Sequence, residues 1–242
     1  MPRANRYYQP GHVWHITHRC IERQFLLKFA RDRRRYLHWL FEAKKRFGLC
    51  VLNYIVTSNH VHLLVKDTGR GEIARSMQLA AARVAQEYNR RKGRKGAFWE
   101  DRYHATAVDS DSHLARCLLY IDLNMVRAGV VSHPGDWAES GFAELVSNRQ
   151  RYQLLDLETL GAFLGLEAGD RVRRVRMDWV DKALEEGAGE RNPEWTESLA
   201  VGSLDFVRQV QQGLGKRAAY RSIRRMDDAC ILGEELGAYE KS

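Results

Sequence analysis

The sequence predicts an α+β protein with a ferredoxin-like antiparallel sheet, helices on one face of that sheet, and a helical C-terminal region. Strand-like patterns in residues 13–19, 50–56 and 59–65 are the first observation behind this prediction. The second is a pair of segments, residues 32–47 and 73–88, whose apolar side chains recur every three or four positions. With a further strand ending at Val108, these segments follow the β-α-β-β-α-β order of the ferredoxin-like fold.

Turn and capping residues mark the boundaries of these elements. Gly48 follows the first predicted helix, at the position where glycine commonly ends a helix. The polar break Thr57-Ser58-Asn59 separates two apolar runs, which predicts an antiparallel hairpin. Capping-type residues at 109–112 predict the start of a third helix, and Gly129 predicts its end.

We divide the chain at residue 135, into a first domain of residues 1–135 and a helical region of residues 136–242. Residues 135–140 look like a loop that leaves the first domain. The helical region is predicted to contain three short helices, at residues 154–166, 178–186 and 204–214. Four arginines within residues 171–176 are compatible with a contact to nucleic acid.

Positive charge is concentrated in the first part of the chain. The formal net charge is +8. Residues 1–150 carry 25 Lys and Arg against 14 Asp and Glu, whereas residues 151–242 carry 14 against 17. A basic first part favours a polyanionic partner, and nucleic acid more than a membrane because no basic amphipathic anchor is evident. The alternative is a basic surface that serves only solubility.

Cysteine usage and hydropathy favour a cytoplasmic protein without a membrane segment. The four cysteines are scattered, with no CxxC pair, which is typical of reduced thiols: Cys20, Cys50, Cys117 and Cys230. No stretch approaches the roughly 18 apolar residues of a membrane span. The N-terminal residues have no apolar run after their basic residues, so no secretory signal is predicted.

The segment Asn59-His60-Val61-His62-Leu63-Leu64-Val65 carries the first candidate site. Successive side chains of a strand alternate between faces, so His60 and His62 share one face while the valines and Leu63 point to the other. Two neutral imidazoles on one face could bind one divalent metal ion. The alternative is a half-buried strand with two hydrogen-bonded histidines. His15, His18 and His104 are interpreted as packing or DNA-facing residues.

The third predicted helix carries a second group of candidate residues. Beside its apolar face lies a stripe with three- to four-residue spacing: Arg116, Tyr120, Asn124 and Arg127. Tyr120 offers a phenol, Asn124 an amide oxygen suited to a hard metal ion, and the arginines offer phosphate contacts. Taken alone, the tyrosine could be a packing residue and the asparagine a solvated one. Opposite the two histidines, the stripe would complete a metal centre beside a nucleophile.

Such a centre suits attack on a phosphodiester. A metal ion polarises a non-bridging oxygen and stabilises the charge that develops on phosphorus. A tyrosine with its ordinary pKa of about 10 needs a base or a nearby cation before it can attack. The product is a covalent phosphotyrosine, which conserves the bond energy and favours strand transfer over hydrolysis.

At these residues the sequence resembles the HUH single-tyrosine transposases, and among them the REP-associated tyrosine transposases of bacteria. The resemblance rests on three short sequence motifs, which occur in the same order as in the family: Asn59 to Val65, Phe98 to Tyr103 (Phe-Trp-Glu-Asp-Arg-Tyr), and Tyr120 to Gly129. The opening from Pro10 to Thr17 is similar as well. The resemblance covers roughly residues 8–147 and is weaker beyond, around residues 201–207.

The resemblance implies a ferredoxin-like catalytic domain with Tyr120 as nucleophile and His60, His62 and Asn124 as metal ligands. It also implies Mg²⁺ or Mn²⁺ as cofactor and single-stranded DNA with a palindromic hairpin, marked by a 5′ tetranucleotide, as substrate. Cleavage would leave a 5′-phosphotyrosine and a free 3′-OH. Ser58 and Met125 stand where the family commonly has proline, and neither change removes a ligand or the nucleophile. A monomer and a homodimer are both compatible with the sequence.

Basic residues outside the metal centre are assigned to DNA contacts, with solvated surface charge as the alternative. They are Arg90, Arg91, Lys92, Arg94, Lys95, Arg102, Arg116 and Arg127.

Three other functions are alternatives to a transposase. A histidine-triad nucleotide hydrolase would need a third alternating histidine, but Leu64 occupies that position. A domesticated, non-cleaving DNA-hairpin-binding protein would keep the basic surface without needing Tyr120. An RNA-binding ferredoxin-like domain would expose aromatic side chains on its sheet in place of histidines.

Overall fold

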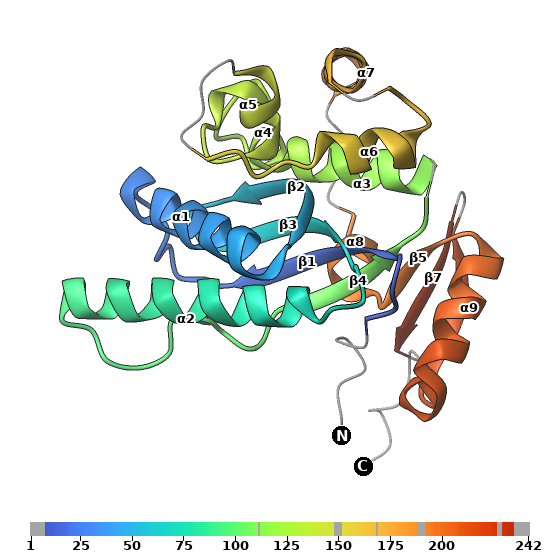
Figure 1. Ribbon diagram of the computed structural model, residues 1–242, viewed down its shortest axis with the longest axis horizontal. Helices are drawn as coiled ribbons and strands as arrows, with labels where there is room; N and C mark the ends of the chain where they lie inside the picture. Colours follow the sequence, from blue (N-terminus) through green and yellow to red (C-terminus); the bar gives the residue numbers. More distant parts are fainter. Residues whose placement is uncertain are drawn as a thin grey trace.

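In the computed structural model, one seven-stranded sheet organises the chain (Figure 1). The structure describes residues 8–110, 112–147, 152–167, 169–187, 192–226 and 229–234. The strand order is β2-β3-β1-β4-β5-β7-β6. The strands are β1 (Val13–Arg19), β2 (Cys50–Val56), β3 (His60–Lys66), β4 (His104–Val108), β5 (Ala200–Gly202), β6 (Arg221–Met226) and β7 (Ala229–Glu234).

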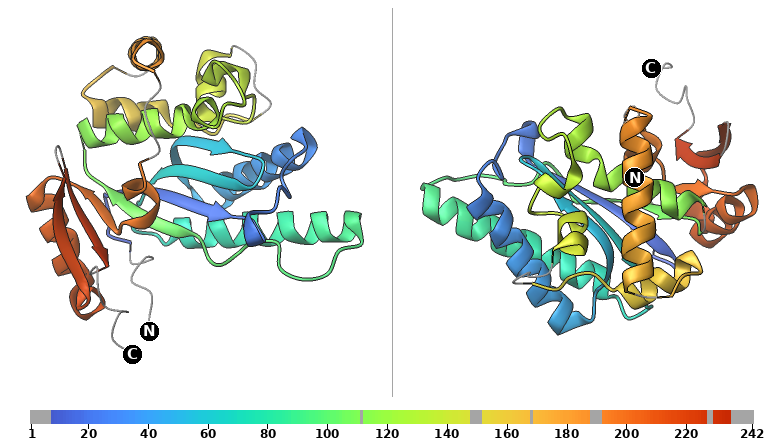
Figure 2. Two further views of the ribbon diagram at one scale, coloured as in Figure 1. Left: turned by 180° about the vertical axis from the view of Figure 1, so that it is seen from behind. Right: turned by 90° about the horizontal axis from the view of Figure 1, so that it is seen from above.

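Helices cover both faces of this sheet (Figures 1 and 2). On one side lie α1 (Ala30–Phe47) and α2 (Glu72–Lys92). On the other lie α3 (Ser112–Asp122), α4 (Asn124–Arg127), α5 (Gly141–Val146), α6 (Leu157–Leu164) and α7 (Asp170–Glu185). A short α8 (Glu194–Glu197) precedes β5, and α9 (Leu204–Leu214) packs against β5 and β7. Three 3₁₀ turns are η1 (Ile21–Arg23), η2 (Pro134–Asp136) and η3 (Gly215–Ala218).

The predicted α+β fold is confirmed, with β1, β2, β3 and β4 forming the antiparallel ferredoxin-like part. As predicted, α1 and α2 of this part lie on one face of the sheet, and the added helices α3, α5 and α6 pack against β2 from the opposite face. Among the described residues, the two larger apolar cores lie on opposite faces of the sheet. Val61, Leu63 and Val65 belong to the core beneath α1 and α2, whereas Leu64 belongs to the core beneath α3. Alternation along β3 therefore turns its histidines toward α3.

The C-terminal region contributes strands as well as helices. β5 pairs in parallel with β4, and β7 and β6 follow in antiparallel pairing, so residues after 135 extend the same sheet. A wholly helical C-terminal region was therefore an incomplete prediction. β5 has only three residues, and β6 reads Arg-Ser-Ile-Arg-Arg-Met, so neither shows the apolar alternation by which strands are recognised.

The predicted helix from residue 112 to residue 129 is interrupted. α3 ends at Asp122, Leu123 adopts φ −82° and ψ 5°, and α4 begins at Asn124. The bend lies between the tyrosine and the asparagine of the polar stripe. None of the helices in the described part of the chain is long and apolar enough to cross a bilayer.

Candidate active site

The two histidines of β3 and the tyrosine of α3 meet in one cavity of about 290 Å³. His60 and His62 enter it from the sheet, and Tyr120 enters it from the last turn of α3. Asn124 and Arg127 enter from α4, beyond the bend at Leu123. The complete lining is Thr17, Arg19, Arg23, Asn59, His60, His62, Tyr120, Asn124, Arg127, Ala128 and Thr196.

Hydrogen bonds hold His62 from its inner side. Its Nδ1 lies 2.9 Å from His15 Nε2 and 3.3 Å from Thr17 Oγ1. Its Nε2 lies 3.2 Å from the Asn124 side-chain amide. His15 Nδ1 in turn lies 2.7 Å from the carbonyl oxygen of Trp195, which belongs to α8. His62 is therefore fixed between the sheet and α4.

His60 is held in a similar way by its own hairpin. Its Nδ1 lies 2.7 Å from Asn59 Oδ1 and 3.0 Å from Thr57 Oγ1. Asn59 donates from its amide nitrogen to the carbonyl of Arg23, which leaves the amide oxygen facing His60. Because that oxygen accepts, the Nδ1 of His60 carries a proton and Nε2 bears the lone pair in the neutral ring.

Burial keeps the inner histidines uncharged. It lowers the pKa of His15 to about 4 and holds the pKa of His62 well below its usual value, with nearby His60 and His15 adding to the effect on His62. A metal ion binds the neutral form of imidazole, so this environment favours the required protonation state near neutral pH.

This donor set could hold one divalent cation. His60 and His62 offer ring nitrogens whose opposite nitrogens are already engaged in hydrogen bonds, as is usual for metal-binding histidines. Asn124 offers an amide beside His62. The described residues contain no group of three or more His, Cys, Asp and Glu side chains suited to a metal ion, so the set depends on Asn124 as its third donor.

Tyr120 is 7% exposed and is surrounded by rings and one cation. Its ring centroid lies 5.8 Å from that of His62 and 5.9 Å from that of His15. The guanidinium of Arg127 lies 4.5 Å from the centroid of the tyrosine ring and also donates a hydrogen bond to the Tyr120 carbonyl. The guanidinium thus makes a cation–π contact with the ring of Tyr120.

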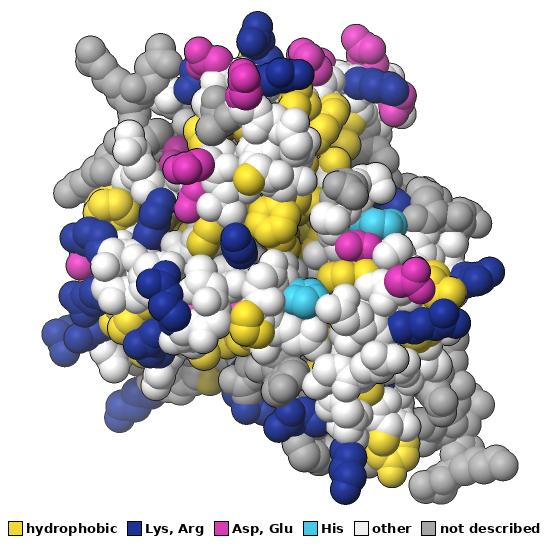
Figure 3. Space-filling model, turned by 45° about the vertical axis from the view of Figure 1, so that its right-hand side comes forward, with side chains coloured by type: hydrophobic (Ala, Val, Ile, Leu, Met, Phe, Trp, Pro, Cys, Tyr) yellow, Lys and Arg dark blue, Asp and Glu magenta, His cyan; other side chains and the backbone are white. Residues whose placement is uncertain are grey.

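The other basic residues predicted to contact DNA lie outside this cavity. Arg116 is on α3 but is absent from the cavity lining. Arg91 pairs with Asp32, and Arg94 donates to Asn89 Oδ1 and to the Ala97 carbonyl. The exposed residues of the set are Arg90, Arg91, Lys92, Lys95 and Arg102. Lys and Arg side chains gather at the left of Figure 3, on the side where α1 and α2 lie.

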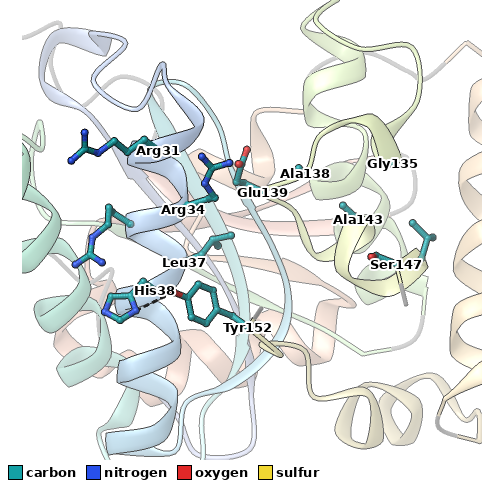
Figure 4. A pocket seen from close by; sticks show the side chains of 12 residues that line it. Arg31, Arg34, Leu37, His38, Gly135, Ala138, Glu139, Ala143, Ser147 and Tyr152 are labelled. Atoms are coloured by element: carbon teal, nitrogen blue, oxygen red, sulfur yellow. Dashed lines mark hydrogen bonds between the residues drawn. The ribbon is translucent and has the colours of Figure 1, made fainter. Parts of the chain in front are cut away.

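A second cavity, of about 630 Å³, lies between α1 and the segment from η2 to α5 (Figure 4). Arg31 and Arg34 of α1 line it, and within the described part of the chain neither forms an ion pair. The wall opposite includes Ala143 of α5, and Tyr152 closes one end with its hydroxyl 3.3 Å from His38 Nδ1. Sequence reasoning did not select these two arginines, although four arginines stand within residues 31–35.

One residue of a predicted basic run, Arg176, has a structural role in place of the predicted contact. Arg176 was included in a run compatible with nucleic-acid contact, but it is 1% exposed and donates to both carboxylate oxygens of Asp122, at 2.7 and 2.6 Å. Asn53 of β2 donates to the same carboxylate at 2.8 Å. Arg176 therefore anchors the end of α3, two residues after Tyr120.

Comparisons with known proteins show similarity in sequence and in fold. The family model described as "Transposase IS200 like" matches residues 9–124. A solved structure described as the REP-associated tyrosine transposase bound to a REP hairpin has a similar fold, with a TM-score of 0.51 and 20% sequence identity. The match covers 71% of this chain and 98% of that chain. A search of curated proteins gives no match.

Proposed function

We propose that the protein is an IS200-like transposase, since that family model matches residues 9–124, and that it acts as a metal-dependent endonuclease and strand transferase for single-stranded DNA. Its substrate would be DNA that carries repeat hairpins, and the reaction would pass through a covalent 5′-phosphotyrosine at Tyr120. The single observation that carries the proposal is the meeting of His60, His62, Asn124 and Tyr120 in one cavity.

Tyr120 is the nucleophile in this proposal. Its phenolic oxygen attacks phosphorus as the phenol loses its proton, a bond from oxygen to phosphorus forms, and the bond from phosphorus to the 3′ oxygen breaks. The leaving oxygen takes up a proton and becomes a free 3′-OH. Arg127, 4.5 Å from the tyrosine ring centroid, stabilises the phenolate and offers a charge to the phosphate.

His60, His62 and Asn124 would hold Mg²⁺ or Mn²⁺ beside Tyr120. When bound, the ion would polarise a phosphate oxygen and offset the charge that develops in the transition state. The chain's own contribution is to present two neutral rings in fixed orientation, through Asn59 for His60 and His15 for His62. Arg19 and Arg23 line the same cavity and would contact the phosphates on either side of the scissile bond.

The hairpin needs a surface beyond the catalytic cavity. The exposed basic side of α1 and α2 is the best candidate, since Arg31 and Arg34 face a cavity and form no ion pair within the described residues. The similar solved structure is described as bound to a hairpin, which supports a folded DNA element as the ligand. Such phosphate contacts would fix position and would weaken with salt.

An adduct assay tests the proposal. Purified protein is mixed with labelled single-stranded oligonucleotides that carry a repeat hairpin, in Mg²⁺ or Mn²⁺, and the products are separated under denaturing conditions. We expect a labelled band at the mass of protein plus DNA, which disappears with EDTA and with Tyr120→Phe. Tight hairpin binding without an adduct under any metal would overturn the enzyme and favour the non-cleaving hairpin-binding protein.

A further inference from the structure

We propose that the backbone carbonyl of Trp195 determines which nitrogen of His62 carries the ring proton, with His15 as the positioning residue between them. The inference rests on the proposed function, because it concerns a residue expected to bind the metal ion. It assigns a role to the C-terminal region, since Trp195 lies outside the residues that match the transposase family.

The first step is the contact between the carbonyl and His15. The Nδ1 of His15 lies 2.7 Å from the Trp195 oxygen, and His15 is 0% exposed. A carbonyl oxygen can only accept a hydrogen bond. The proton of the His15 ring must therefore be on Nδ1, because a bare nitrogen facing that oxygen would bring two lone pairs together in a buried place.

The second step is that the proton position on His15 fixes the proton position on His62. A neutral imidazole carries one N–H, so a proton on Nδ1 leaves His15 Nε2 as an acceptor. This acceptor lies 2.9 Å from His62 Nδ1, and the two rings are stacked with an interplanar angle of 16°. His62 must then donate from Nδ1. His15 is 0% exposed and its hydrogen-bond partners include no acidic side chain, so a charged ring would be buried without a counter-charge.

The third step is the result at the cavity. With its proton on Nδ1, His62 directs a bare Nε2 toward Asn124, whose amide lies 3.2 Å away. A bare nitrogen is what a metal ion requires. The opposite tautomer would place an N–H in the cavity and exclude the ion from that position.

Thr17 is the other group near His62 Nδ1, at 3.3 Å. A hydroxyl can donate or accept, so Thr17 adapts to either tautomer and cannot select one. The Trp195 carbonyl has no such freedom. It is also held firmly, since the Trp195 side chain is 1% exposed within the core beneath α3 and α8 packs against β1 and β4.

Nitrogen NMR of protein labelled with ¹⁵N-histidine tests the inference without metal or DNA. Protonated and bare ring nitrogens have well-separated ¹⁵N shifts, and the His62 signals are those lost in His62→Gln. We expect the Nδ1-protonated tautomer for His62 in the wild-type protein near pH 7. Finding His62 protonated on Nε2 would overturn the inference, whatever the variants do.

Two substitutions at His15 then test the relay. His15→Phe keeps a ring but removes the acceptor, so we expect the His62 tautomer to become mixed and Mn²⁺ affinity to fall roughly 10–100-fold, as for other residues that orient a metal ligand. His15→Gln can donate to the carbonyl and accept from His62, so it should restore both readouts. An unchanged tautomer in His15→Phe, with the fold verified by circular dichroism, would contradict the relay. The adduct assay on the wild-type protein fails or succeeds independently of these signals.

Discussion

The residues up to 135 and the residues beyond 135 contribute to the cavity in different ways. The first part supplies the side chains that would touch the reacting phosphate or its metal ion: His60, His62, Tyr120, Asn124 and Arg127. The later part supplies supports, namely the Trp195 carbonyl behind His15 and the Arg176 guanidinium behind Asp122. Among the described residues of the later part, only Thr196 reaches the cavity lining. Chemistry and its positioning are thus divided between two stretches of one chain.

The later part is therefore an integral part of the site, and it belongs to the same folded unit as the first part. β5 continues the sheet next to β4, so the same hydrogen-bonded framework that carries β1 and β3 also fixes α8. A change in the later part should therefore alter stability or metal binding before it alters the reaction itself. Four experiments test this division of roles.

Loss of the nucleophile should have the largest effect. Tyr120→Phe removes one hydroxyl and keeps the ring contacts with His62 and Arg127, so the fold and DNA affinity should persist while adduct formation falls by about 10³-fold or more. Quantitative gel analysis of adduct yield measures it. An adduct that still forms in this variant would show that another residue is the nucleophile, and would contradict the role given to Tyr120.

Loss of the buried anchor should come next, as a defect in stability. Arg176→Met leaves the Asp122 carboxylate buried with Asn53 as its remaining partner, and removing one member of a buried ion pair costs about 3–5 kcal/mol. Urea denaturation measures the free energy of unfolding. Arg174→Met, on the same helix but exposed, is the matched control and should change it by less than about 0.5 kcal/mol. Equal effects of the two variants would show that burial of Arg176 has no special role.

Loss of the third metal donor should weaken metal binding and leave stability nearly intact. Asn124→Ala removes the amide beside His62 Nε2 on a half-buried position of α4, and we expect Mn²⁺ affinity to fall about tenfold or more. Titration calorimetry on the metal-free protein is the measurement. Asn124→Asp supplies a carboxylate oxygen and should bind at least as tightly as wild type. Unchanged affinity in Asn124→Ala would remove this residue from the metal site.

The smallest effect should come from the basic surface of α1. Arg31→Glu and Arg34→Glu should each weaken hairpin binding several-fold and reduce the slope of log affinity against log salt by about one. Fluorescence anisotropy over a salt series reads both values. Arg174→Glu makes the same charge change in the later part and should have less effect. If Arg174→Glu weakens hairpin binding equally, the DNA-binding surface extends over α7, and DNA contacts are not confined to the first part of the chain.

The sequence predicted the first part well because its signals are local. Alternation in β3 placed Val61 and Leu63 in one core and the histidines on the other face, as the structure has them. The three- to four-residue spacing of Tyr120, Asn124 and Arg127 was enough to bring them to one cavity despite the bend at Leu123. Arg116 follows the same spacing but lies one turn before Tyr120 and does not reach the cavity.

The supporting contacts of the Trp195 carbonyl and of Arg176 could not be predicted from the sequence, and the physical reason differs between the two. Every residue has a backbone carbonyl. The residue type at position 195 therefore gives no sign that its carbonyl accepts a hydrogen bond from His15, 180 positions earlier. Arg176 sits among exposed arginines, and its burial depends on the approach of α7 to the end of α3. Asp122 gave the one available hint, as an acidic side chain on the largely apolar helix that ends beside the bend.

The bond from Trp195 to His15 also has a consequence for the timing of biosynthesis. Its two ends are 180 residues apart, which corresponds to about 10–40 s of translation at ordinary rates. During that interval β1, β2, β3 and β4 can emerge and pair, while the ring that must orient His62 still lacks its acceptor. A nascent chain would thus hold a folded scaffold, and the proposed catalytic centre would be complete only after α8 has left the ribosome.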